Sequence, residues 1–73
     1  MVTPKKTLGA NIRRLRLLRR LSQEELSEQA GIHYTFLGHI ERGTKAPSLT
    51  TLCSIAQALT VTPSQLMRGI CQS

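Results

Sequence analysis

The chain has 73 residues, which is enough for one small domain and too few for a scaffold with a deep active-site cleft. Apolar residues make up 40% of it, so a packed core can form and disorder is excluded. Ten lysines and arginines against four glutamates and no aspartate give a net charge of +6, which favours a polyanionic partner such as nucleic acid, anionic lipid or an acidic protein.

The first predicted helix runs from about Pro4 to Arg20, with proline at its tolerated first position. Leu8, Ile12 and Leu15 form an apolar stripe at helical spacing. Seven of the ten basic residues lie in this segment, and no acid interrupts them. A basic amphipathic helix can bind a membrane surface. The domain core needs this apolar stripe, however, so we expect no membrane partner.

The second predicted helix begins with a capping box. The hydroxyl of Ser22 can accept the backbone N–H of Glu25, and the Glu25 side chain can reach back. The three glutamates of this segment also lie near the positive end of the helix dipole, which gives them a structural role. The helix is expected to end by Ala30, because Gly31 can adopt the left-handed conformation that closes a helix.

The third predicted helix covers about residues 33–42 and ends at Gly43. Leu37 and Ile40 mark its inner face. The opposite face lacks the lysine and glutamate that usually meet water, and it consists of Tyr34, Thr35, Gly38, His39 and Arg42. Glycine costs about 1 kcal/mol relative to alanine inside a helix. Gly38 therefore either lets a ligand approach the backbone closely or is a tolerated defect.

Two further helices follow. Ser48 caps a fourth helix with a broad apolar stripe, and Thr62, Pro63 and Gln65 form a second capping box at the start of a short fifth helix. No segment alternates with a period of two, so no sheet is expected. The sequence predicts an all-α single domain over residues 1–73, with loose ends at about 1–4 and 70–73.

Two short helices joined through a glycine form a helix-turn-helix. The motifs SQEEL, IERG and PSL, leading into LxxIAxAL, occur here in order around Gly31. From about Leu8 to Leu66 the chain resembles the Cro/C1-type (XRE family) helix-turn-helix proteins, which include lambdoid phage repressors. The resemblance implies a compact five-helix lambda-repressor-like DNA-binding domain, with the helix-turn-helix at residues 22–43. The small size is similar to that of restriction–modification controller proteins.

The resemblance also implies roles for individual residues. The third helix would lie in the major groove of double-stranded DNA, where Tyr34, Thr35 and His39 would read base edges. The phosphate backbone would be contacted by Gln23, His33, Arg42, Thr44 and Lys45. His33 has a second possible role as the helix cap. Arg16 and Glu41 would form a partly buried ion pair that holds the helices together.

Members of this family commonly bind inverted repeats as homodimers. The expected interface consists of Val61, Leu66, Met67 and Ile70, although the same residues can instead complete the core. RNA polymerase is a second possible protein partner. The alternative function is that of an antitoxin or another protein-interaction module, which binds a partner chain as well as DNA. The sequence decides neither the operator nor whether binding represses or activates.

No catalytic constellation, metal-ligand spacing or phosphate loop is present, so we expect no enzyme activity, no metal and no cofactor. Cys53 and Cys71 lie in no zinc-site spacing. They are expected to be reduced thiols of a cytoplasmic, bacterial or phage-encoded protein, with Cys53 half-buried. No run of about 18 apolar residues and no signal peptide are present.

Overall fold

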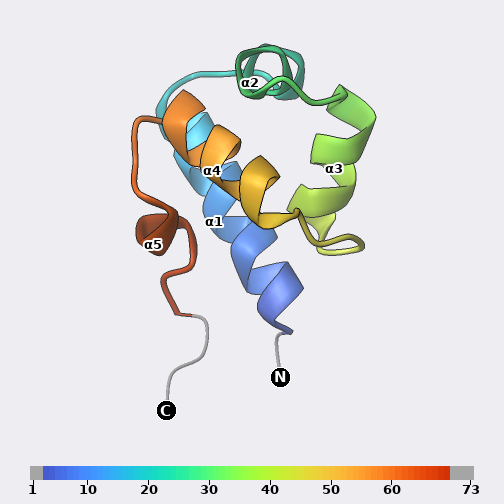
Figure 1. The fold of residues 1–73 in the computed structure, drawn as a ribbon, viewed down its shortest axis with the longest axis vertical. Coiled ribbons are helices and arrows are strands. Elements are labelled where there is room, and N and C mark those ends of the chain that lie inside the picture. Colours follow the sequence, from blue (N-terminus) through green and yellow to red (C-terminus); the bar gives the residue numbers. More distant parts are fainter. Residues whose placement is uncertain (1–2, 70–73) are drawn as a thin grey trace.

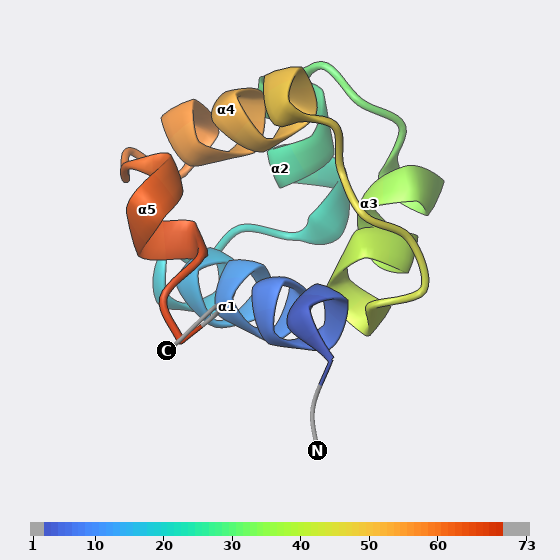
Figure 2. The same ribbon diagram turned by 60° about the horizontal axis from the view of Figure 1, so that its bottom comes forward.

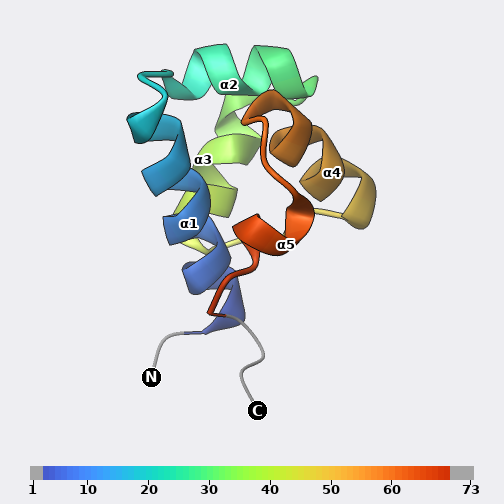
Figure 3. The same cartoon turned by 90° about the vertical axis from the view of Figure 1, so that its left-hand side faces the viewer.

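Five helices and no strand make up residues 3–69, the part of the chain that the computed structural model describes. The predicted all-α fold is confirmed. In Figure 1, α3 and α5 lie on opposite sides of the α1 and α4 pair, and Figure 3 shows α2 across the end of the molecule where α1 stops. The helices are α1 (Pro4–Leu18), α2 (Gln23–Ala30), α3 (Tyr34–Arg42), α4 (Leu49–Ala58) and α5 (Pro63–Leu66).

Both predicted capping boxes are present. At the start of α2 the backbone N–H of Glu25 donates to Ser22 Oγ at 3.0 Å, and the N–H of Ser22 donates to Glu25 Oε1 at 2.9 Å. Thr62 and Gln65 make the same reciprocal pair at the start of α5. Each box satisfies backbone donors that have no partner inside the helix, so these helix starts follow from local sequence.

The capping box of α2 predicts a dependence of stability on pH. The pKa of Glu25 lies below its usual value of 4.5, chiefly because the backbone N–H of Ser22 donates to the carboxylate, and the Ser22 side chain adds to the effect. A carboxyl whose pKa falls on folding contributes stability above its unfolded pKa, and this contribution disappears as the pH falls through the folded pKa. Urea unfolding between about pH 6 and pH 3 should therefore show a smaller acid-induced loss in Glu25→Gln than in the wild type. Equal losses in the two proteins would contradict this linkage.

The helix ends depend on residues with positive φ. Gly31 and Gly43 close α2 and α3 with φ of 73° and 77°, as the sequence predicts. The end of α1 differs from the prediction, because the helix stops at Leu18 and not at Arg20. Arg20 itself adopts φ of 58°, and the N–H of Leu21 then bonds the carbonyl of Arg16 at 3.1 Å. This is a Schellman closure without glycine, which the sequence pattern does not signal.

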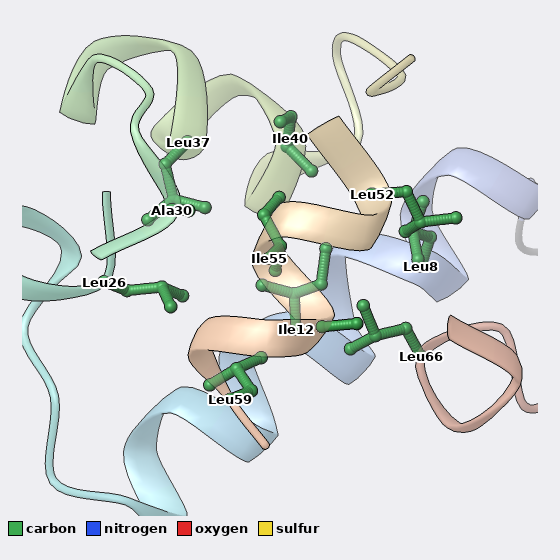
Figure 4. Close-up of a cluster of buried hydrophobic side chains, with 11 residues drawn as sticks. Leu8, Ile12, Leu26, Ala30, Leu37, Ile40, Leu52, Ile55, Leu59 and Leu66 are labelled. Atoms are coloured by element: carbon green, nitrogen blue, oxygen red, sulfur yellow. The ribbon is translucent and has the colours of Figure 1, made fainter. Parts of the chain in front are cut away.

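Eleven buried apolar residues from all five helices form the core, and most of them are labelled in Figure 4. Leu66 is fully buried among them, so it completes the core of its own chain. Cys53 is exposed, which corrects the expectation of a half-buried thiol, and Cys71 lies outside the described residues. None of the helices within residues 3–69 is both long and apolar enough to cross a membrane.

The crossing of α1 and α3 depends on Gly9. A Cβ atom added there would lie 2.3 Å from the carbonyl oxygen of Ile40 and 2.5 Å from that of Glu41. Figure 2 shows the C-terminal end of α3 beside the first half of α1. The absence of a side chain at this position therefore lets α3 approach α1 closely, and this approach fixes where the outer face of α3 is presented.

Candidate nucleic-acid interface

The two faces of α3 are sharply divided. Leu37 and Ile40 are completely buried against the core, and Glu41 is 8% exposed. On the other face Tyr34 is 52% exposed, Thr35 is exposed beside it and His39 is partly buried. Residues three or four apart share a helix face, so the positions predicted to read bases form one continuous polar stripe. The hydrophobic side anchors the helix and leaves that stripe open to a ligand.

At the start of α3, His33 serves as the helix cap. Its Nδ1 accepts the backbone N–H of Thr35 at 3.1 Å, and its ring stacks on that of Tyr34 with 4.8 Å between centroids. A backbone N–H can only donate, so Nδ1 must be the acceptor and the ring proton of the neutral imidazole lies on Nε2. Capping and contact with an anion are therefore compatible, because Nε2–H stays available as a donor.

At the end of α3, three polar side chains meet around one ring nitrogen. His39 Nδ1 lies 3.0 Å from Thr44 Oγ1 and 3.4 Å from Arg42 Nη2. The Thr44 oxygen also lies 3.1 Å from the carbonyl oxygen of His39. A phosphate oxygen accepts hydrogen bonds, and the single hydroxyl proton of Thr44 is used inside the protein. The position of Thr44 thus favours a role in orienting the His39 ring over a role in binding phosphate.

Gly38 makes room for a side chain of its own helix. A Cβ atom at this position would lie 3.2 Å from Arg42 Nη1, which is the nearest group that it would meet. The guanidinium therefore lies across the glycine on the outer face of α3. Gly38 is therefore buried and is not part of the open face that the sequence pattern predicts.

Behind the polar stripe, one carboxylate joins α1, α2 and α3. Arg16 Nε donates to Glu41 Oε2 at 2.7 Å and Arg16 Nη2 donates to Oε1 at 3.0 Å, so the predicted ion pair is present and bidentate. Arg16 Nη1 also donates to the carbonyl of Leu21 at 2.8 Å. Gln23 Nε2 bonds Glu41 Oε1 at 3.0 Å. This last contact was not predicted, and no local sequence signal indicates it.

The contact with Glu41 orients the amide of Gln23 and occupies only one of its two protons. An amide nitrogen carries two protons, and one of them is directed at the carboxylate. The second proton and the N-terminal backbone of α2 remain for an anion, which helix N-termini favour. Arg42 ends α3 and Lys45 follows it, and both are exposed. Gln23, through its contact with Glu41, therefore lies near the C-terminal end of α3, whereas His33 lies at its start.

The residues predicted to form a dimer interface differ in how far they are buried. Val61 is partly buried before α5 and Met67 is 41% exposed after it, whereas Leu66 belongs to the core. Ile70 lies outside the described residues. Within residues 3–69, no group of three or more His, Cys, Asp or Glu side chains is arranged to hold a metal ion.

Comparisons with known proteins agree with this arrangement. The helix-turn-helix family HTH_3 matches residues 12–66. The control protein C.SmaI of Serratia marcescens is 38% identical over 63 residues, which cover 86% of this chain and 75% of that protein. The restriction-modification controller protein C.AhdI from Aeromonas hydrophila has a TM-score of 0.83 at 34% identity, covering 85% of this chain and 94% of that chain. SinR, a master regulator for biofilm formation solved in complex with DNA, has a TM-score of 0.79 at 31% identity, covering 82% and 97% of the respective chains.

Proposed function

We propose, because this chain belongs to the helix-turn-helix family HTH_3 of DNA-binding transcription regulators, that α3 is the helix that enters the major groove. The resemblance found in the sequence motifs is confirmed by the family match, and the related proteins are regulators and not enzymes. The observation that carries the proposal is the division of α3 into a fully buried apolar face and an exposed polar face. The major groove of B-DNA is wide enough to admit such a helix.

The base-reading residues of the proposal are Tyr34, Thr35 and His39. The two hydroxyl groups can both donate and accept, and the methyl group of Thr35 can contact thymine. None of the three makes the common arginine–guanine or glutamine–adenine pair. The target sequence therefore has to be determined by experiment. The ring of Tyr34 stacks on that of His33, which restricts the rotation of the Tyr34 side chain.

The phosphate contacts of the proposal are made by Gln23, His33, Arg42 and Lys45. The first two offer an amide proton and Nε2–H near the helix starts, and the last two offer positive charge at the end of α3 and just after it. These contacts fix the register of the protein on DNA and carry no base information. The net charge of +6 adds a long-range attraction. Binding should weaken steeply as the salt concentration rises, because the release of counterions from DNA becomes less favourable. Thr44 is left out of this set because its hydroxyl proton is used on His39 or its carbonyl.

We further propose that the active species is a homodimer on an inverted repeat, since the symmetry of an operator mirrors that of its protein. Val61 and Met67, which flank α5, are the described residues that support this interface. Burial of these side chains on association would also add to the thin core of a short chain. The protein would act in the bacterial cytoplasm, and the similarity to controller proteins favours a regulator of that type.

The proposal is tested by selecting bound duplexes from a random-sequence pool at about 150 mM salt, where non-specific binding is weak. We expect enrichment of an inverted repeat, and sedimentation of the protein–DNA complex should give two chains per duplex. His39→Ala should lose selectivity at one position of each half-site and keep the rest. Enrichment of a single half-site would contradict the dimer, and no enrichment at all would contradict base reading by α3. A second chain that co-purifies with the protein would support the antitoxin alternative.

A further inference from the structure

The surroundings of His39 Nδ1 determine which ring nitrogen carries the proton. Arg42 Nη2 lies 3.4 Å from Nδ1, and a guanidinium nitrogen can only donate. A proton on Nδ1 would therefore face a second donor and a positive charge. The lone pair of Nδ1 has to point toward Arg42, which leaves the proton of a neutral imidazole on Nε2.

Thr44 supports the same assignment. Its hydroxyl has one proton and two acceptors within reach, His39 Nδ1 at 3.0 Å and the carbonyl oxygen of His39 at 3.1 Å. The carbonyl already accepts the backbone N–H of Thr44 at 3.0 Å. The carbonyl therefore has a donor without the hydroxyl. Because Arg42 makes Nδ1 an acceptor, the hydroxyl proton that bonds the carbonyl in one rotamer can turn to Nδ1 in another. In that second rotamer both neighbours of Nδ1 are donors.

We propose that Arg42 and Thr44 hold His39 in the neutral Nε2–H tautomer, so that its outward nitrogen donates to guanine in the major groove. Guanine offers two acceptors, N7 and O6, on its major-groove edge and no donor, whereas thymine offers a single acceptor, O4, beside its methyl group. Adenine places an amino donor beside its N7, and cytosine offers an amino donor. This inference rests on the proposed function of α3, and it makes Thr44 a positioning residue for base reading.

The tautomer is measured first in the free protein, by correlating the ring protons and nitrogens of histidine in NMR spectra at pH 8, where imidazole side chains are ordinarily neutral. We expect His39 to show Nε2–H in the wild type and in Thr44→Ser. The double variant Arg42→Met with Thr44→Val should show an increased Nδ1–H population. His33 is the internal control, because its Nδ1 is held by the backbone of Thr35 in every variant. Nδ1–H at His39 in the wild type would overturn the inference.

The identity of the base that His39 contacts is measured next, on the operator obtained by selecting bound duplexes. The position read by His39 is the one at which His39→Ala loses selectivity, and we expect guanine there. Replacing that guanine with 7-deazaguanine removes N7 and should weaken wild-type binding about tenfold, the usual effect of about one hydrogen bond. The same replacement should weaken binding by the double variant Arg42→Met with Thr44→Val less than about threefold, while Thr44→Ser should behave like the wild type. A required thymine, or a required adenine or cytosine amino group, at this position would overturn the inference and leave the proposed function intact.

Discussion

Replacing Glu41 with alanine should lower the free energy of unfolding by about 3–5 kcal/mol, because the change leaves the buried Arg16 guanidinium without its partner. The two side chains are only 2% and 9% exposed, and no buried side-chain polar atom of the described residues lacks a partner. The loss is a large part of the 5–15 kcal/mol that usually stabilises a domain. Gln23 loses its contact as well, so the start of α2 should loosen with the end of α3. Urea unfolding followed by circular dichroism measures the effect.

Two controls separate the loss of a partner from the loss of a charge. Glu28→Ala removes an exposed carboxylate from α2 and should change stability by less than about 0.5 kcal/mol. The double variant Arg16→Met with Glu41→Leu removes both charges together and should recover much of the stability, since apolar replacement of a buried pair is often neutral. A double variant as unstable as Glu41→Ala would show that packing and not the unpaired charge determines the loss.

Gly9→Ala should destabilise the protein by about 3 kcal/mol, at the upper end of the usual cost of overpacking. The added Cβ would meet two backbone carbonyl oxygens of α3 at 2.3 Å and 2.5 Å, and backbone atoms cannot rotate away as side chains do. The gain of about 1 kcal/mol from placing alanine in a helix is included in this figure. Because the contact is with α3, the separation of the helices should also weaken DNA binding. Thermal unfolding and a DNA titration of the same sample measure the two effects.

Gly38→Ala is the matched control, since it makes the same change inside another helix. The nearest group to the added Cβ is the flexible guanidinium of Arg42 at 3.2 Å. We expect stability to rise by up to about 1 kcal/mol. Unchanged DNA affinity would favour the tolerated-defect explanation of Gly38, whereas weaker binding would favour close approach of DNA to the helix backbone. Equal destabilisation by Gly9→Ala and Gly38→Ala would contradict the role given to the α1–α3 crossing.

Local sequence determined much of this protein. The capping boxes at Ser22 and Thr62, the glycine closures at Gly31 and Gly43, and the buried apolar face of α3 were all predicted correctly. Each depends on interactions between residues within about one or two helical turns, which propensity and spacing report directly. The Arg16–Glu41 pair joins residues 25 apart, and only the resemblance to a known family indicated it.

The tertiary structure decided the rest. Leu66 was assigned an interface as well as a core role, and the packing of α5 placed it in the core. Gln23 contacts Glu41 across 18 positions, and Asn11 holds the chain after α5 by donating to the carbonyls of Leu66 and Arg68. Gly9 is an ordinary weak helix residue in the sequence and a close helix contact in the fold. The residues in these contacts are far apart in the chain, so no local periodicity encodes them, and they exist only once the helices are packed together.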